Sequence, residues 1–210
     1  MALSLCMIVK DEEETLPHCL NSVRDVVDEM IVVDTGSRDR TLTIAENYGA
    51  KVFSFPWNND FAAARNESLQ HATGDWILVL DADETLVPAA IPAMQTAIAN
   101  PAALVITLRR QEIGANLPPS SLSRLFRNHP DIRFSRPYHE LIDDSVASLL
   151  QHQPEWKVLE LPEVAILHTG YQGKTIAQRR KVDRARSIME SYLKQHPDDA
   201  YMCSKLGALY

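Results

Sequence analysis

Two aspartates that follow an apolar run near the middle of the chain offer the clearest prospect of chemistry. Asp81 and Asp83 stand two positions apart, directly after Ile77–Leu80, which has the composition of a buried strand. Ligand sites of α/β sheets lie outside the carboxyl ends of strands, and two carboxylates there can hold Mg²⁺ or Mn²⁺ while leaving positions for water and phosphate oxygens. The spacing therefore predicts a divalent metal site, with helix capping as the alternative.

A third aspartate, Asp34, ends another apolar run and is followed by Gly36 and Ser37. An aspartate at a strand end can accept hydrogen bonds from a nucleoside base or ribose. Glycine permits a positive φ or the close approach of a ligand. Because ordinary turns favour the same residue types, a nucleoside site and a plain turn are both open here.

Arg65 and Asn66 lie one turn beyond Asp60, in a segment of helical character. If this segment begins near the strand ends, the guanidinium of Arg65 could bind a phosphate or a carboxylate through two parallel hydrogen bonds. A solvated or salt-bridged arginine is the alternative.

The elements that position these residues alternate along the first part of the chain, apolar runs with segments of helical period. This alternation predicts an α/β fold with a mostly parallel sheet covered by helices on both faces. The predicted strands are Leu3–Val9, Met30–Val33, Lys51–Phe55 and Trp76–Leu80, and the predicted helices are 16–27, 39–49 and Phe61–Ala72.

The second half of the chain is less regular. We expect a helix at Pro88–Ala99, a strand at Ala103–Arg109 and a loop at Glu112–Ser121. Strands or strand-loop pieces are expected at Leu122–Arg127 and Ile132–Ile142, and a later strand pair at Val158–Leu161 and Val164–His168.

The last part of the chain changes to a long polar helix, Ile176–Gln195, and a second helix from Ala200. A helix, a Pro-Asp turn and a helix are how a helical repeat begins, and a single unit cannot bury its own face. We therefore expect a main domain at 1–172, a helical extension at 173–210 that begins TPR-like repeats, and a native protein that continues beyond Tyr210.

Composition narrows the class of protein. The 210 residues are 45% hydrophobic and 23% charged, which favours a folded, water-soluble protein of one domain plus a smaller unit. The net charge of −7 excludes a broadly cationic surface for nucleic acid or an anionic membrane. Three cysteines without C-x-x-C spacing favour a reducing cytoplasm. An anionic ligand would need local arginines, backbone N–H groups or a metal ion.

Four blocks in order carry a resemblance to a known family. The chain resembles the family 2 glycosyltransferases, inverting enzymes of the GT-A fold, over about its first 90 residues. The blocks are Ser4–Glu14 (SLCMIVKDEEE), Ile31–Thr41 (IVVDTGSRDRT), Asp60–Asn66 (DFAAARN) and Gly74–Glu84 (GDWILVLDADE).

Three further blocks are similar to a branch of that family that includes lipopolysaccharide-core glucosyltransferases and tetratricopeptide-repeat glycosyltransferases. They are Leu122–Arg127 (LSRLFR), Phe134–Leu141 (FSRPYHEL) and Ile166–Tyr171 (ILHTGY). The chain departs from the pattern at Ser135-Arg136-Pro137, where a glycine and a small apolar residue are expected ahead of the His-Glu pair.

The resemblance implies a nucleotide-sugar donor, usually a UDP-sugar, and an acceptor hydroxyl on a lipid, glycan, peptide or small molecule. It implies a cytoplasmic enzyme, with the inner face of the membrane as an alternative place of action. The implied donor-binding residues are Val9, Asp11, Glu12, Asp34, Gly36, Ser37, Arg65, Asn66, Asp81, Ala82, Asp83 and Arg127.

The chemistry of sugar transfer assigns further roles. Glu140 is the candidate base that takes the proton of the acceptor hydroxyl, and His139 orients it or contacts substrate. Asp83 and Asp81, with His168 as a further ligand, would hold Mg²⁺ or Mn²⁺, which neutralises the leaving diphosphate. Arg124 and Arg127 could also face the phosphates, and we expect at least one of the two to lie on a solvated strand face.

Two other classes of function remain open. Asp81-x-Asp83-x-Thr85 also matches the nucleophile motif of haloacid-dehalogenase-like phosphatases, with Asp81 as phosphoryl acceptor and Asp83 as acid/base. Thr107 and Asp143-Asp144 could serve as its later motifs, but that motif normally lies on the first strand of the fold. The other alternative is a non-catalytic module that binds a nucleotide and recruits a partner through the helical tail.

Overall fold

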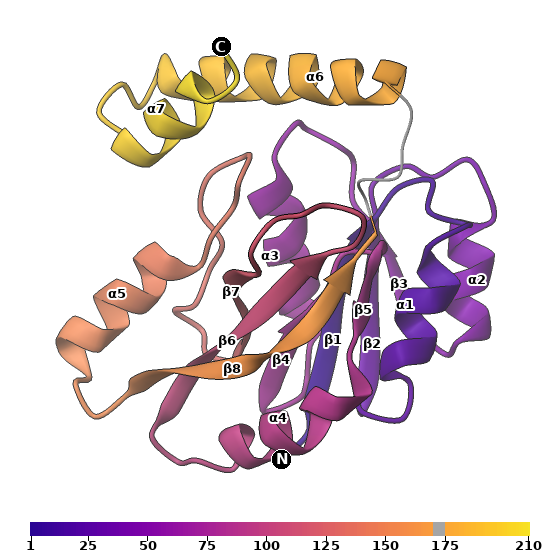
Figure 1. Cartoon of the computed structure of the whole chain (residues 1–210), viewed down its shortest axis with the longest axis vertical. Coiled ribbons are helices and arrows are strands. Elements are labelled where there is room, and N and C mark those ends of the chain that lie inside the picture. Colours follow the sequence, from indigo (N-terminus) through magenta and orange to yellow (C-terminus); the bar gives the residue numbers. More distant parts are fainter. Residues whose placement is uncertain (170–174) are drawn as a thin grey trace.

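An eight-stranded mixed sheet forms the centre of the molecule, with the strand order β3-β2-β1-β4-β7-β6-β8-β5 (Figure 1). The computed structural model describes residues 1–169 and 175–210, and side chains at 1–169 and 182–210. The first half contains β1 (Leu3–Val9), α1 (Leu16–Val23), β2 (Glu29–Asp34), α2 (Thr41–Asn47), β3 (Lys51–Ser54), α3 (Phe61–His71) and β4 (Trp76–Val79).

The second half adds the antiparallel part of the sheet and the terminal helices. It contains β5 (Glu84–Leu86), a 3₁₀ turn η1 (Pro88–Ala90), α4 (Ile91–Ile98), β6 (Ala103–Glu112), β7 (Ser120–Arg127), α5 (Asp143–His152), β8 (Lys157–His168), α6 (Thr175–Leu193) and α7 (Ala200–Gly207).

Strand directions bring many chain segments to one edge of the sheet. Strands β1 to β4 are parallel, β7 is antiparallel to β4 and to β6, β8 is parallel to β6, and β5 is antiparallel to β8. The ends of β1–β4, β6 and β8 and the starts of β5 and β7 therefore lie together. We call this the site edge; it is the upper edge of the sheet in Figure 1, below α6 and α7.

Helices cover both faces of the sheet, as the alternation of elements predicts. Helices α1, α2 and α4 pack on one face and α3 and α5 on the other. On α1 the buried residues Leu16, Leu20 and Val23 recur at helical spacing, which gives the helix one apolar face. On β1 the side chains of Leu5 and Cys6 point into opposite layers, because successive residues of a strand alternate faces.

The terminal helices α6 and α7 form an antiparallel pair with a small core of their own, made by Ala185, Met189 and Met202. The helices predicted at Ile176–Gln195 and from Ala200 are confirmed as elements. The predicted domain boundary between residues 172 and 173 and the end of the Ile166–Tyr171 block lie outside the described residues.

Of the two segments predicted as strands or strand-loop pieces, Leu122–Arg127 lies in β7, whereas Ile132–Ile142 is not a strand. This segment is irregular and contains one isolated bridge, between Ser135 and Leu141. Arg136 and His139 have φ values of 74° and 53°, in the left-handed region, and Pro137 cannot donate a ladder hydrogen bond. A regular strand is incompatible with these backbone angles.

Other differences concern where strands begin and end. The predicted pair Val158–Leu161 and Val164–His168 is one strand, β8, and the short strand β5 pairs with its end. Strand β6 continues to Glu112, and β7 begins at Ser120. None of the helices in the described part of the chain combines the length and apolar character of a membrane span.

Candidate functional site

A buried arginine is the centre of the site edge. Arg65, one turn into α3, is 4% exposed. Its Nε donates to Glu140 Oε1 at 2.6 Å and its Nη2 donates to Asp81 Oδ1 at 2.6 Å. Arg65 therefore joins the predicted base to the first aspartate of the D-x-D pair, although these residues are 75 and 16 positions away from it in the sequence.

Asp81 is enclosed by two arginines. Its second oxygen, Oδ2, accepts from Arg124 Nη2 at 2.9 Å, and its backbone N–H donates to Glu84 Oε2 at 2.9 Å. Burial alone would raise the pKa of the Asp81 carboxyl, but the guanidinium groups of Arg124 and Arg65 hold that pKa well below its usual range. Asp81 is therefore an anion bound to two cations.

The chain of alternating charges continues across the sheet to β6. Glu84 is fully buried and accepts from Arg110 Nη1 at 3.0 Å. Arg110 Nη2 lies 2.9 Å from Glu112 Oε1. A buried carboxylate needs a paired cation to remain charged, which Arg110 supplies for Glu84.

His168 closes this chain of charges at the end of β8. Its Nε2 lies 3.1 Å from Asp83 Oδ2, and its Nδ1 contacts Glu112 Oε2. The hydrogen bond to Asp83 raises the pKa of His168, and burial of the ring lowers it. The hydrogen bond to Glu112 raises the pKa further, to about 9. The imidazole is therefore cationic at neutral pH and neutralises Asp83.

The pair Asp83 and His168 fits a divalent metal ion better than the predicted trio with Asp81. Among the residues that the structure describes, no group of three or more His, Cys, Asp or Glu side chains is arranged to hold a metal. Both oxygens of Asp81 bind arginines. Asp83 can offer one oxygen, and His168 can offer one ring nitrogen once the metal ion displaces its proton, a donor set that suits Mn²⁺ with its other positions open.

The predicted nucleoside residues lie on two adjacent loops at the site edge. Asp34, 6% exposed, accepts from Gly36 N–H at 3.0 Å and from Ser37 N–H at 3.1 Å. Gly36 has a φ of 108°, which favours glycine. The carboxylate thus builds the tight turn that sequence alone left as an alternative.

The loop after β1 is fastened to this turn. The Asp11 N–H donates to Ser37 Oγ at 2.9 Å, and the Glu12 N–H donates to Thr41 Oγ1 at 2.7 Å. Val9 is buried, and its carbonyl accepts from the N–H of Thr35 at 3.0 Å. These contacts place Val9, Asp11 and Glu12 beside Asp34.

Asn66 has a different place from the one predicted. Its side-chain amide donates to the Phe134 carbonyl at 2.9 Å, and its carbonyl accepts from the Phe134 N–H at 2.8 Å. Asn66 thus holds the segment that leads to Glu140. Ala82 is buried in the turn between Asp81 and Asp83 and packs in the core.

His139 lies next to Glu140 in the loop after Phe134. The residue as a whole is exposed, while partial burial of its ring and the nearby Lys205 lower the pKa of His139, which favours the neutral imidazole. Its ring contacts the Tyr138 ring edge-to-face at 5.0 Å. Among the described residues, Glu140 makes its hydrogen bond and ion pair with Arg65, and none with His139.

The structure corrects the assignment of Arg127. Arg127 pairs with Trp76 at the opposite end of the sheet, where its Nε donates to the Ala103 carbonyl at 2.7 Å and its guanidinium stacks on Trp76 and Trp156. Strand β7 runs antiparallel to β4, so its start, with Arg124, reaches the site edge and its end does not.

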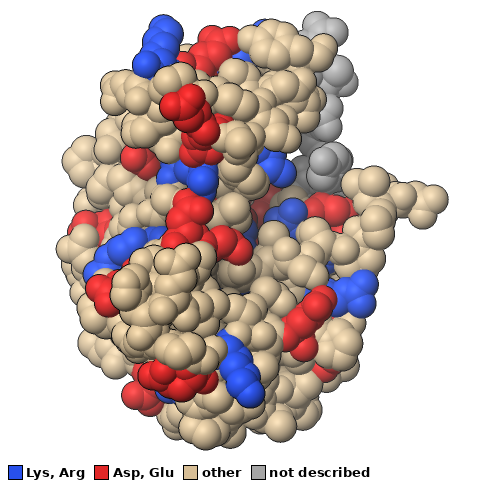
Figure 2. Space-filling model, turned by 90° about the vertical axis from the view of Figure 1, so that its left-hand side faces the viewer, with Lys and Arg blue, Asp and Glu red and all other residues tan. Residues whose placement is uncertain are grey.

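Glu84, Arg110 and Glu112 belong to the site edge and were not predicted from the sequence. Arg110 and Glu112 are two positions apart near the end of β6, so their side chains share one face of the strand. This alternation of positive and negative residues at the end of a strand is the sequence signal that could have revealed them. Figure 2 shows acidic and basic residues interspersed on the face that it displays, without a continuous patch of one sign.

Solved structures share this architecture. TarS residues 1–349 from S. aureus, in complex with UDP-GlcNAc, has a TM-score of 0.69 and 18% identity, over 100% of this chain and 71% of that chain. Glucosyl-3-phosphoglycerate synthase from Mycobacterium tuberculosis, in complex with Mn²⁺, UDP and phosphoglyceric acid, has a TM-score of 0.65 and 15% identity, over 92% and 78% of the two chains. The fold is GT-A.

Sequence comparisons give the family. Residues 4–159 match glycosyl transferase family 2, and the chain belongs to this family. A TPR repeat-containing protein of Synechococcus elongatus is 54% identical over 208 residues, which are 99% of this chain and 52% of that protein. The chain thus spans about half the length of this relative.

Proposed function

We propose that the chain transfers a sugar from a nucleoside diphosphate sugar, namely a UDP-sugar, to a hydroxyl acceptor with inversion at the anomeric carbon. Family membership supports a glycosyl transfer, and the structural neighbours in complex with UDP-GlcNAc and UDP support a uridine nucleotide. The loops that carry Val9, Asp11 and Asp34 form the proposed nucleoside side of the site.

The observation that carries the proposal is the link through Arg65. It places Glu140 and the D-x-D segment at one edge, with Arg65 between the two carboxylates. Oε1 of Glu140 accepts from Arg65, while Oε2 has no hydrogen-bonding partner among the described residues. Oε2 is therefore the atom that can take a proton from an acceptor.

The transfer is a direct displacement. Glu140 takes the proton of the acceptor hydroxyl as its oxygen bonds to the anomeric carbon. The bond from that carbon to the diphosphate breaks on the opposite face, and its electron pair stays with the diphosphate. A base in this position typically contributes about 10²–10⁴-fold to the rate.

Mg²⁺ or Mn²⁺ is the proposed cofactor, held by Asp83 and His168. When bound, such an ion stabilises the negative charge that develops on the leaving diphosphate. In this proposal Asp81 serves instead to fix Arg65 and Arg124, because both its oxygens are engaged by them.

The haloacid-dehalogenase alternative receives no support. The D-x-D segment follows β4, and three other strands precede β4 in the chain. Thr107 donates to the Leu159 carbonyl, and Asp144 pairs with Arg136, so neither residue joins Asp81.

The variant Glu140→Gln tests the assignment of the base. We expect the affinity for UDP to be unchanged and the rate of UDP release from UDP-glucose or UDP-N-acetylglucosamine to fall at least 100-fold. The rate is measured with water alone and with a pool of hydroxyl acceptors. Glu155→Gln, at an exposed position, is the matched control and keeps wild-type turnover. Retained turnover in Glu140→Gln would remove Glu140 as the base.

Residues 173–210 are proposed to begin a TPR-like repeat. The helix pair α6 and α7 and the name of the Synechococcus relative support this proposal. Reading the gene past Tyr210 should reveal further helix pairs at a spacing of about 34 residues. A stop codon directly after Tyr210 would contradict it.

A further inference from the structure

Arg136, in the loop that carries Glu140, joins three parts of the molecule. Its Nη1 lies 2.5 Å from Asp144 Oδ2 at the start of α5, and its Nε donates to Asp199 Oδ2 at 2.9 Å at the start of α7. The guanidinium also lies 5.0 Å from the centre of the Tyr201 ring on α7. The side chain is 13% exposed, so these contacts shield it from water.

The backbone of Arg136 is in a conformation that favours glycine. Its φ is 74°, and side chains with a Cβ are strained in this region. The family pattern that the chain resembles has a glycine in this part of the loop. Backbone strain at such a position persists only where surrounding interactions hold it, and the contacts of the guanidinium are among the interactions that do so here.

The loop between Ser135 and Leu141 is closed at its base, so a shift of Arg136 is carried to Glu140. The Ser135 N–H donates to the Leu141 carbonyl at 2.9 Å, and the Leu141 N–H donates back at 3.3 Å. The Pro137 carbonyl accepts from the Phe61 N–H at the start of α3, the helix that carries Arg65.

On the other side, Asp199 fixes the terminal helices to this loop. Its Oδ1 caps α7 by accepting from the Met202 N–H at 3.0 Å, and its Oδ2 accepts from Arg136 and from the Tyr192 hydroxyl of α6 at 3.2 Å. Tyr138, two residues before Glu140, packs against the core of α6 and α7. Figure 1 shows both helices above the site edge.

A second contact attaches α6 to the start of α3. The guanidinium of Arg184 lies 4.6 Å from the centre of the Trp57 ring and 5.3 Å from that of Phe61. The terminal helices thus contact both segments that hold Glu140, the loop itself and the helix of Arg65.

We propose that Arg136 is a positioning residue through which α6 and α7 fix the loop of Glu140 in its place for proton transfer. This inference rests on the proposed role of Glu140. It makes the terminal helices a part of the catalytic apparatus, because the position of the base depends on the ion pair of Arg136 with Asp199.

The test uses Arg136→Gly, Asp199→Asn and the double variant in the full chain. Glycine removes the ion pair and relieves the strain, so the midpoint of thermal unfolding need not fall, and asparagine can still cap α7. We expect Arg136→Gly to lower kcat for UDP release about 10-fold or more while the KM for the UDP-sugar stays unchanged. In the Asp199→Asn background the same change has a smaller effect on kcat, because the ion pair between Arg136 and Asp199 is already absent.

Arg133→Gly, which removes an exposed arginine three residues away, is the matched control and keeps the wild-type kcat. An unchanged kcat in Arg136→Gly, or equal effects of the change in both backgrounds, would overturn the inference. Retained turnover in Glu140→Gln would show that Glu140 is not the base. If Glu140→Gln is inactive and Arg136→Gly is fully active, only the positioning role falls.

Discussion

Both ends of the sheet hold carboxylates that accept several hydrogen bonds, but the donors differ between the two ends. At the end opposite the site edge, Glu29 Oε1 accepts from Ser4 Oγ at 2.6 Å, from the Thr73 hydroxyl at 2.9 Å and from the Gly74 N–H at 3.2 Å, while its Oε2 accepts from Lys51 at 2.8 Å. Short side chains and backbone groups thus surround one oxygen.

At the site edge, arginine side chains supply the donors to both carboxylate oxygens of Asp81. Arg65, Arg110 and Arg124 connect Asp81 and Glu84 to their neighbours, and Arg65 Nη1 and Arg110 Nε are buried without a hydrogen-bonding partner in the described part of the chain. Native proteins satisfy most buried polar groups, so a ligand or water can complete the network at these two donors, while Trp76 Nε1 is such a donor at the opposite end.

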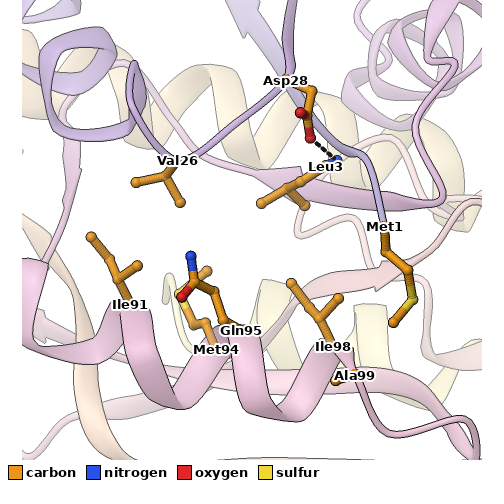
Figure 3. Close-up of a pocket in the computed structure, with 9 residues that line it drawn as sticks. All are labelled: Met1, Leu3, Val26, Asp28, Ile91, Met94, Gln95, Ile98 and Ala99. Atoms are coloured by element: carbon orange, nitrogen blue, oxygen red, sulfur yellow. Dashed lines mark hydrogen bonds between the residues drawn. The ribbon is translucent and has the colours of Figure 1, made fainter.

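The difference teaches how to separate a structural carboxylate from a functional one. Two backbone N–H groups and two hydroxyl groups hold one oxygen of Glu29, whereas a guanidinium can bind a phosphate in the same bidentate way as a protein carboxylate. A hollow of about 250 Å³ between the start of β1 and α4 is lined mainly by apolar residues such as Leu3, Ile91 and Met94, and no arginine or lysine of the described part of the chain lines it (Figure 3).

Arg65→Met should have the largest effect, because it leaves Asp81 and Glu140 without their shared cation. Removing one partner of a buried ion pair costs about 3–5 kcal/mol, so we expect the free energy of unfolding to fall by that amount. Urea unfolding at pH 7 measures it. Arg24→Met, which breaks an exposed pair with Asp25, should change it by less than about 0.5 kcal/mol. Equal effects of the two changes would remove the contrast between buried and exposed pairs.

Gly74→Ala acts at the opposite end through packing. A Cβ on Gly74 would lie 2.5 Å from Ser4 Oγ and 2.9 Å from the Ala2 carbonyl. Such overpacking typically costs about 1–3 kcal/mol of the free energy of unfolding. The folded variant should keep its affinity for UDP, since the site edge is untouched. Gly207→Ala, where no atom lies within 4 Å, is the control and should not destabilise the protein.

Glu29→Gln should give the smallest effect and a defined pH dependence. Burial would raise the pKa of Glu29, but hydrogen bonds from Lys51, Ser4 and Thr73 lower it from 4.5 to about 2. The carboxylate therefore contributes stability above pH 4.5, and this contribution is lost as the pH falls toward 2. We expect a deficit of about 1–2 kcal/mol for the variant at pH 7, after allowance for solvent screening, which closes between pH 4.5 and 2. A deficit that is constant with pH would contradict this.

The parallel half of the fold could be predicted from the sequence because its strands are continuous apolar runs and its helices bury one face. Leu5, Ile31 and Leu78 are fully buried between two helical layers, so their segments carry a strong apolar signal. The same reasoning placed Asp81 and Asp83 after β4, at the site edge.

The rest of the site could not be predicted from the sequence, because it depends on strand direction and on contacts between residues far apart in the chain. Arg124 and Arg127 are three positions apart, about 10 Å along a strand, and only the antiparallel course of β7 decides which one reaches Asp81. The ion pair of Arg65 with Glu140 spans 75 positions, and no local pattern encodes it. The loop of Glu140 looks partly like a strand in the sequence because its apolar residues Ile132, Phe134 and Ile142 stand an even number of positions apart. In the structure these residues are buried, as strand residues would be.

Calorimetric titration of UDP into the full chain, with and without Mn²⁺, tests the central claim that the site edge binds a nucleoside diphosphate through Asp83 and a metal ion. We predict that Mn²⁺ increases the affinity at least 10-fold, that Asp83→Ala abolishes this increase, and that Asp131→Asn, at an exposed position, preserves it. Equal affinity for UDP with and without Mn²⁺ in the wild-type protein would contradict the account.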